Sequence, residues 1–122
     1  MRILIADDAD WVHRFLQKLL EGSGVSILAA RDGCEAVRIV SNQVVDLILM
    51  DWNMPGMDGL AATRAIRALG PVAARIPIIA YTNRDSPQDV AECLGVGMTH
   101  HLSKGVPPDE LLEKLMSIMG AL

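Results

Sequence analysis

Four charged residues occupy positions where a parallel sheet would place its binding groups. They are Asp7, Asp8, Asp51 and Lys104. The two adjacent aspartates, the single aspartate and the lysine each come directly after a short segment of the kind that forms a strand. Ligands of open parallel sheets bind just outside the carboxyl ends of the strands. The sequence therefore predicts one pocket in which three carboxylates and one ammonium group converge.

Such a pocket suits a divalent cation held beside a reactive aspartate. Buried carboxylates repel one another and need a compensating positive charge, and hard cations such as Mg²⁺ or Mn²⁺ prefer oxygen ligands. Asp51 can then attack phosphorus to form an acyl phosphate, with Lys104 as a second positive contact. The Thr82 hydroxyl, at the end of another apolar run, can donate to a phosphoryl oxygen. Taken singly, these residues also fit plain roles as helix caps, loop residues or a surface lysine.

The elements that must position these groups alternate along the chain. We predict strands at residues 2–6, 25–30, 44–50, 77–81 and 99–102. Apolar residues at helical spacing follow each strand, with the third helix at 60–69, the fourth from Ser86-Pro87 to about Leu94, and the last from Pro107. Five such repeats predict an α/β fold in which a parallel sheet has five helices on its two faces. The flavodoxin-like, doubly wound order 2-1-3-4-5 brings Asp7, Asp8 and Asp51 within reach of one ion.

The apolar pattern also predicts which side chains are buried. Trp11, Phe15 and the Met-rich last helix, including Met116, are expected in the core, whereas His13 and His100 are expected at the surface.

Composition limits the classes of protein that fit. The 122 residues predict one domain over residues 1–122, and the net charge of −4 with no basic patch argues against direct binding of nucleic acid. No apolar run reaches the ~18 residues needed for insertion into a membrane. The two cysteines, Cys34 and Cys93, lack a C-x-x-C spacing, so we expect no disulfide framework and a cytoplasmic location.

Four motifs together resemble the receiver domains of two-component response regulators, particularly the chemotaxis type. They are Asp7-Asp8, the segment DWNMPGMDG at residues 51–59, Tyr81-Thr82 and Leu102-Ser103-Lys104. The resemblance covers essentially the whole chain. It implies a signalling domain of a phosphorelay rather than an enzyme, in which Asp51 takes a phosphoryl group from a histidine kinase or phosphotransfer protein. Mg²⁺-dependent self-phosphorylation from a phosphodonor and slow self-dephosphorylation would be its only chemistry.

The resemblance also assigns residues to roles. Asp8 would ligate Mg²⁺ directly, Asp7 largely through water, and Asn53 through its backbone carbonyl, while Thr82 and Lys104 would contact the phosphoryl group. Inward movement of Thr82 would let the residue at His101 rotate, which switches the face formed by the fourth helix, fifth strand and fifth helix for binding an effector.

Three residues depart from the family pattern. His101 stands where an aromatic switch residue is usual, which suggests either a tolerated planar substitute or a muted or pH-sensitive switch. Gly105 replaces a proline, so the loop after Lys104 is expected to be trans, or cis under strain. Asn83 replaces a small residue and precedes Arg84, which predicts an altered rate of dephosphorylation.

Three other readings stay open at this point. A haloacid dehalogenase-like phosphatase would need a second aspartate where the chain has Asn53, and a flavodoxin would need a first loop that does not repel phosphate. A receiver-like scaffold that works without phosphate is the third. The sequence fits both a stand-alone regulator and one domain of a longer protein.

Overall fold

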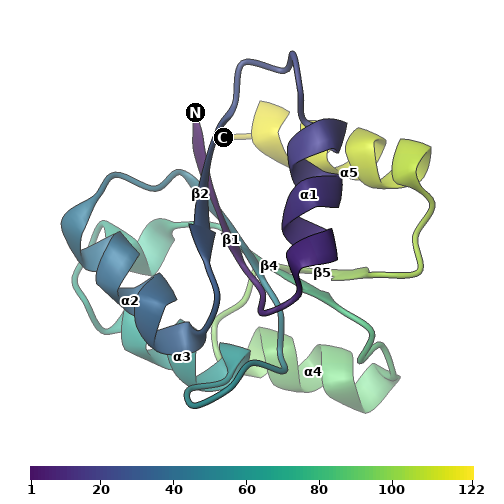
Figure 1. The fold of residues 1–122 in the computed structure, drawn as a ribbon. Helices are drawn as coiled ribbons and strands as arrows, with labels where there is room; N and C mark the ends of the chain where they lie inside the picture. The colour runs from purple at the N-terminus through teal and green to yellow at the C-terminus, as the bar shows by residue number, and fades with distance from the viewer.

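A parallel sheet of five strands forms the centre of the molecule, and the computed structural model describes all 122 residues (Figure 1). The strands are β1 (Arg2–Ala6), β2 (Ser26–Ala30), β3 (Leu47–Met50), β4 (Ile78–Thr82) and β5 (His100–Ser103). They lie in the order β2-β1-β3-β4-β5, and every neighbouring pair is parallel. The predicted flavodoxin-like arrangement is confirmed.

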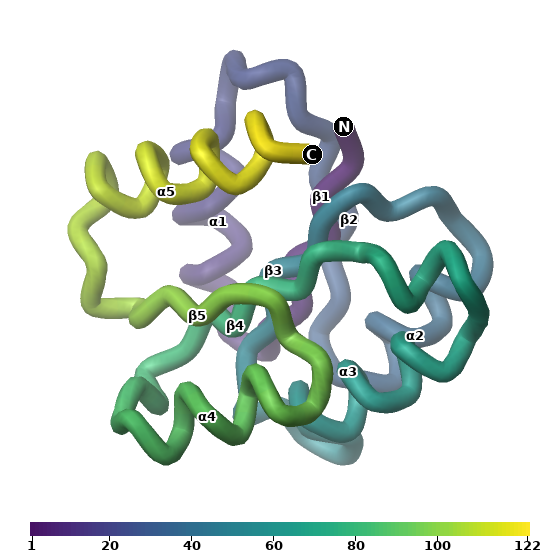
Figure 2. Tube along the Cα trace, turned by 180° about the vertical axis from the view of Figure 1, so that it is seen from behind, coloured from purple at the N-terminus to yellow at the C-terminus, as the bar shows by residue number.

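Helices cover both faces of this sheet. They are α1 (Asp10–Leu19), α2 (Gly33–Asn42), α3 (Gly59–Arg67), α4 (Pro87–Gly95) and α5 (Pro108–Gly120), with a short 3-10 helix, η1 (Ala73–Arg75), before β4. Helices α1 and α5 pack on one face, and α2, α3 and α4 pack on the other (Figures 1 and 2). The 3-10 helix was not predicted, and β4 and β5 begin and end one residue later than expected.

The neighbouring inner strands β1 and β3 are largely apolar on both sides because both of their faces are covered. In β1, Ile3 and Ile5 face the layer of α1 and α5, whereas Leu4 and Ala6 face the layer of α2 to α4. Every residue of β3 is buried. A strand buried in this way reads as a continuous apolar run, which is why β1 and β3 could be located from sequence.

Polar side chains fix the starts of three helices. Asp32 accepts a hydrogen bond from the Glu35 amide at α2, Asp58 from the Ala61 amide at α3, and Ser86 from the Asp89 amide at α4. These contacts satisfy backbone N–H groups that have no partner within the helix. Each cap lies at the carboxyl end of the sheet, and the caps of α3 and α4 tie down the far ends of the loops that follow β3 and β4.

Several predictions of burial were wrong. Trp11 is 51% exposed because the first turn of α1 lies beyond the strand ends, and Met116 is 47% exposed on the outer side of α5. His13 is buried, since its ring bonds to the Asp7 carbonyl. Val44 is exposed because β3 begins at Leu47 rather than at residue 44. The exposed position of His100 is confirmed.

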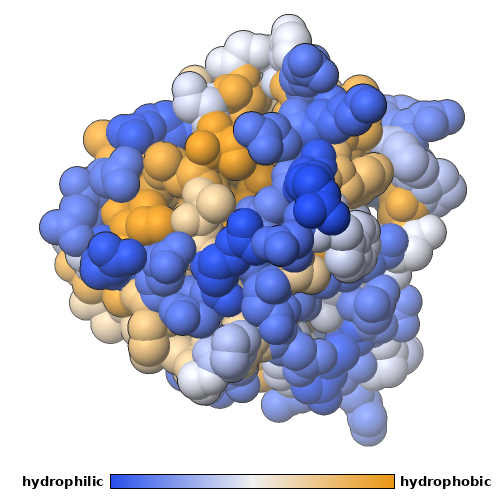
Figure 3. Space-filling model, viewed as in Figure 1, coloured by the Kyte–Doolittle hydropathy of each residue, from blue (hydrophilic) through white to orange (hydrophobic).

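The surface is mostly hydrophilic in the view of Figure 3, with a hydrophobic area along the edge strand β2. Ile27 and Leu28 of this strand are only partly buried, as expected at a sheet edge. No helix combines the length and apolar character needed to cross a membrane.

Candidate functional site

The pairing of β1 with β3 places two aspartates side by side. Ala6 is the partner of Met50, and the Asp51 amide donates to the Ala6 carbonyl at 2.9 Å. The next residue of each strand, Asp7 and Asp51, therefore leaves the sheet at the same edge. This is the point where the strand order reverses, which is the usual binding position in doubly wound sheets.

Three carboxylates meet at this edge. One oxygen each from Asp7, Asp8 and Asp51 lies within 4.8 Å of the others. Asp7 and Asp51 are only 2% and 7% exposed, whereas Asp8 is exposed. The set thus has two buried members and one that faces solvent.

Lys104 lies against both buried carboxylates. Its Nζ is 2.8 Å from Asp7 Oδ2 and 3.2 Å from Asp51 Oδ2. The lysine is held in place because its backbone amide donates to the Thr82 carbonyl at 3.1 Å. No peptide bond is cis, so the loop with Gly105 in place of proline is trans and Lys104 still reaches the site.

The other carboxylate oxygens are fixed by backbone amides. Asp51 Oδ1 accepts from the Trp52 amide at 2.8 Å, and Asp7 Oδ1 accepts from the Ala9 amide at 2.9 Å. Asp7 therefore ties down the start of α1 as well as facing Lys104. One oxygen of each buried aspartate is used by the backbone, and the second is directed at the ammonium group.

Burial and charge shift two pKa values in the site. Loss of hydration, with help from the negative charge of Asp7, raises the pKa of Asp51 above its ordinary value, although Lys104 opposes the shift. Burial alone would lower the pKa of Lys104, but its hydrogen bond to Asp7 and the charges of Asp51 and Asp7 outweigh burial and raise it. The ammonium form of Lys104 is thus favoured, and a further positive charge near Asp51 would favour its ionised form.

Gly59 lets α3 approach the site closely. A Cβ at this position would overlap the backbone carbonyl of Asp51. The Gly59 amide also donates to the Trp52 carbonyl at 2.9 Å. The loop from Asp51 to Gly59 is therefore closed on itself, with a shape that only glycine permits.

The remaining predicted residues lie around this centre. Thr82 is buried at the end of β4, and its Oγ1 accepts from the Arg84 amide at 3.2 Å. Asn53 is exposed in the loop after β3. His101 is half-buried on β5 and does not point at the carboxylates, because its Nε2 bonds to the Arg84 carbonyl at 2.8 Å.

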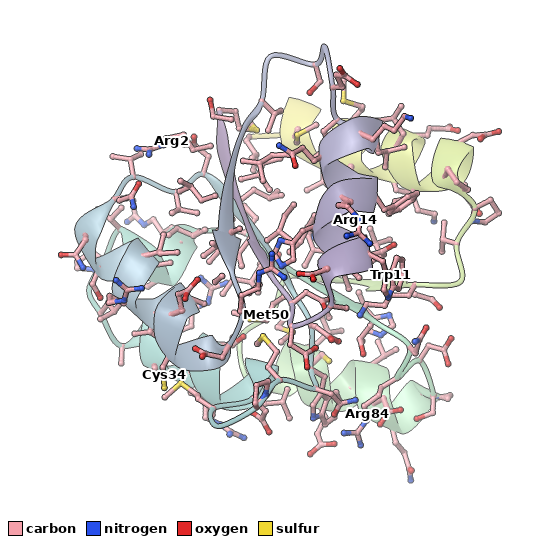
Figure 4. The ribbon with its side chains drawn as sticks, viewed as in Figure 1. Arg2, Trp11, Arg14, Cys34, Met50 and Arg84 are labelled. Carbon is pink, nitrogen blue, oxygen red and sulfur yellow. The ribbon has the colours of Figure 1, made fainter.

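Two aromatic–cation contacts were not predicted. The Arg84 guanidinium lies 3.7 Å from the centre of the Trp52 ring, and Lys104 Nζ lies 5.8 Å from the centre of the Trp11 ring. Figure 4 labels one residue of each pair, Arg84 and Trp11. Trp52 is buried beside Asp51, so Arg84 covers it from the loop between β4 and α4. No local pattern announces such pairs, since each joins residues far apart in sequence.

The donor set fits a hard divalent cation. Three carboxylates offer oxygen ligands from two adjacent loops, and the exposed member leaves room for water. This is the ligand chemistry that Mg²⁺ and Mn²⁺ prefer. The cluster consists of carboxylates alone, and neither Cys34 nor Cys93 belongs to it.

The fold and this site define a class: a doubly wound α/β domain with an acidic pocket at its topological switch point. Residues 3–116 match the family model described as the response regulator receiver domain. The chain belongs to this family, whose members are generally signalling domains of two-component systems.

Curated relatives include signalling proteins much longer than this chain. The CAI-1 autoinducer sensor kinase/phosphatase CqsS of Vibrio cholerae is 40% identical over 114 residues, which cover 93% of this chain but 17% of CqsS. Response regulator MprA of Mycobacterium sp. (strain KMS) is 33% identical over 119 residues, which cover 98% of this chain and 50% of MprA. The chain thus spans half or less of the length of these relatives.

Solved structures show the same fold. The receiver domain of sensor histidine kinase PA1611 from Pseudomonas aeruginosa, with a magnesium ion coordinated in its active site cleft, has a TM-score of 0.86 at 35% identity. The match covers 98% of this chain and 97% of that one. Vibrio cholerae chemotaxis response regulator CheY4 has a TM-score of 0.88 at 30% identity, over 96% and 97% of the two chains.

Proposed function

We propose that this chain is a phosphoacceptor receiver domain in which Asp51 takes a phosphoryl group from a phosphohistidine. The observation that carries the proposal is the arrangement of Lys104 between Asp7 and Asp51, with Asp8 beside them at the solvent edge. A site built only for stability would gain nothing from three clustered carboxylates at one strand edge.

Asp7, Asp8 and Asp51 would hold Mg²⁺ or Mn²⁺, together with the Asn53 carbonyl. When bound, the ion would neutralise the negative charge of the phosphoryl oxygens during transfer. The magnesium ion in the receiver domain of PA1611 supports this choice of cation.

The transfer itself needs only the chain's own nucleophile. The Asp51 carboxylate attacks phosphorus, the phosphorus–nitrogen bond of the donor breaks, and the electron pair leaves with the imidazole. The Lys104 ammonium and the Thr82 hydroxyl then pair with phosphoryl oxygens. In the return step water attacks phosphorus, the Asp51 carboxylate leaves, and inorganic phosphate is released.

The donor is a histidine kinase or a histidine phosphotransfer protein. The names of two similar proteins, the sensor kinase/phosphatase CqsS and the sensor histidine kinase PA1611, support this class of partner. The output is a change on the face formed by α4, β5 and α5, which Arg84 links to the site because it contacts both Thr82 of β4 and His101 of β5. A local charge at Asp51 would bias this face between two states.

The test is to incubate the protein with Mg²⁺ and acetyl phosphate and to follow its intact mass. One added phosphoryl group on the wild type and none on Asp51→Asn is expected. Asp109→Asn serves as the matched control, because Asp109 is an exposed carboxylate on α5 and should not affect the adduct.

Two results would contradict the proposal. An adduct that persists on Asp51→Asn would place the acceptor elsewhere. If the wild type formed no adduct and its Trp52 fluorescence did not change on addition of Mg²⁺, the result would favour a receiver-like scaffold that works without phosphate.

A further inference from the structure

Arg84 is the centre of a contact network that joins the loop after β4 to the rest of the site. Its guanidinium carbon lies over the Trp52 ring, 3.7 Å from the ring centre, and its Nη2 lies 3.7 Å from Asp89 Oδ1 of α4. Its carbonyl accepts from His101 Nε2 at 2.8 Å. Its amide donates to Thr82 Oγ1 at 3.2 Å. Arg84 is thus held by the loop after β3, by β5 and by α4, and its amide in turn holds Thr82.

The contact to Thr82 has a chemical consequence. A hydroxyl group has one hydrogen to donate and two lone pairs to accept with. Because the Arg84 amide already occupies a lone pair, the hydroxyl is oriented and its hydrogen remains free to donate. Thr82 is 1% exposed, so little water competes for that hydrogen.

We propose that Arg84 is a positioning residue for phosphoryl transfer, which orients the Thr82 hydroxyl as a donor by stacking on Trp52. The inference rests on the proposed function, since the acceptor of that hydrogen would be a phosphoryl group on Asp51. Arg84 makes no ion pair with the site carboxylates Asp7, Asp8 and Asp51, and it acts on the site only through Thr82.

The other contacts explain why arginine suits this position. A guanidinium is planar and weakly hydrated, so it can stack on an indole and still pair with a carboxylate. The Trp52 ring is fixed in the core, which makes it a rigid support. The loop gains a second tie because Ser103 Oγ donates to Asp85 Oδ2 at 3.1 Å. Loss of the arginine side chain should therefore weaken the positioning of the backbone N–H of residue 84 against Thr82, without unfolding the loop.

The experiment measures adduct formation from acetyl phosphate in saturating Mg²⁺, at a series of donor concentrations, by intact mass. Arg84→Ala should lower the maximal rate about five- to tenfold, equivalent to about 1–1.4 kcal/mol at 1.4 kcal/mol per tenfold. The half-saturating donor concentration and the Mg²⁺ affinity, measured by calorimetry, should change by less than about twofold. Arg84→Lys keeps a cation near the ring and should recover part of the rate.

A double-mutant cycle decides whether the effect passes through Thr82. Thr82→Ala should lower the rate on its own, and adding Arg84→Ala to it should cause no further loss. His101→Ala, which removes the tie to the Arg84 carbonyl, should act in the same direction as Arg84→Ala but more weakly. Arg64→Ala is the matched control, because Arg64 is exposed on α3 and away from the site.

The outcomes separate this inference from the proposed function. A wild type that forms no adduct would refute both. A wild-type adduct with an unchanged rate in Arg84→Ala would overturn only the role of Arg84. The role of Arg84 would also be overturned if Arg84→Ala lowered the rate of adduct formation equally in the wild type and in Thr82→Ala. A loss of Mg²⁺ affinity in Arg84→Ala that matched the loss of rate would have the same meaning, since Arg84 would then act by another route.

Discussion

Removal of the Lys104 ammonium should expose how strongly the metal-free site depends on it. The variant Lys104→Met keeps most of the side-chain volume and removes only the charge. The ammonium lies 2.8 Å from Asp7 and 3.2 Å from Asp51, and the three side chains are 8%, 2% and 9% exposed. The variant would leave two buried carboxylates without a counter-charge.

The size of the effect can be bounded. Breaking a buried ion pair by removing one partner costs about 3–5 kcal/mol. A stranded aspartate can instead bind a proton, at about 1.36 kcal/mol for each unit between pH 7 and its ordinary pKa of 3.8, or about 4 kcal/mol. Because the pKa of Asp51 is raised in the folded protein, the free-energy cost of protonating it is smaller than this. We expect Lys104→Met to lower the free energy of unfolding by about 3 kcal/mol at pH 7.

Urea unfolding in a chelator such as EDTA measures this loss. At pH 5 the penalty should fall to at most about 1.6 kcal/mol, because protonation of the carboxylate is easier. Excess Mg²⁺ should restore more stability to Lys104→Met than to the wild type, since a cation that binds only the folded state stabilises it. Lys114→Met is the control, as this exposed lysine of α5 forms no ion pair and should change stability by less than about 0.5 kcal/mol.

One result would refute the reasoning directly. If Asp51→Asn/Lys104→Met were no more stable than Lys104→Met, the stranded Asp51 carboxylate could not be the cause of the loss. A Lys104→Met protein as stable as the wild type in EDTA would show that the buried pairs contribute nothing net.

Three other predictions follow from the same contacts. Asp51→Asn should stabilise the metal-free protein at pH 7, because the pKa of Asp51 is raised in the folded state. The wild type regains this stability as the pH falls through the raised pKa toward 3.8. The difference in free energy of unfolding between the variant and the wild type, measured in urea, should therefore be smaller at pH 4 than at pH 7. Gly59→Ala should destabilise the protein by about 3 kcal/mol and weaken Mg²⁺ binding, because its Cβ meets the Asp51 backbone, whereas Gly105→Ala meets only Ser103 Oγ at 3.5 Å and should be tolerated. Arg67→Met should cost about 2–3 kcal/mol in thermal or urea unfolding, because the guanidinium donates to the Gly97 and Ala73 carbonyls, and the same change at exposed Arg64 should be near neutral.

The sheet could be predicted because burial on both faces leaves a plain trace in sequence. β1 and β3 are continuous apolar runs, and their parallel pairing puts Asp7 beside Asp51 without any knowledge of side-chain contacts. The start of β3 could not be predicted from the same signal. Val44 is as apolar as the strand, but Asp46 accepts from the Arg2 amide, so pairing with β1 begins only at Leu47.

Helical periodicity told less about α1. It places Trp11 on the same stripe as Phe15, yet the first turn extends past the sheet and Trp11 stands beside Lys104 instead of the core. His13 was expected in solvent, but a hydrogen bond from its Nε2 to the Asp7 carbonyl allows burial. Periodicity predicts which face of a helix a side chain occupies. It does not predict whether the sheet extends far enough to cover that side chain.

The hydrogen bond of His101 limits how this residue could act as a pH-sensitive switch. A carbonyl oxygen can only accept, so Nε2 of His101 must carry the hydrogen that bonds to Arg84. That nitrogen keeps its hydrogen in both the neutral and the charged ring, and protonation adds a hydrogen at Nδ1. The tie to Arg84 should therefore persist when the ring is charged. A pH-sensitive switch would have to work through Nδ1, and His101→Tyr with an unchanged pH dependence of partner binding would exclude it.

The arrangement of charge gives the site two competing occupants. In the metal-free protein, the Lys104 ammonium offsets the repulsion between Asp7 and Asp51, and a divalent cation would offset the same repulsion. The two positive charges also repel each other, so binding of the cation should weaken the hold of Lys104 on the carboxylates. A phosphoryl group on Asp51 would bring new negative charge and give both cations a partner. Mg²⁺ affinity should accordingly be lower in the unmodified protein than in Lys104→Met, and the lysine would limit the metal-bound fraction until phosphate arrives.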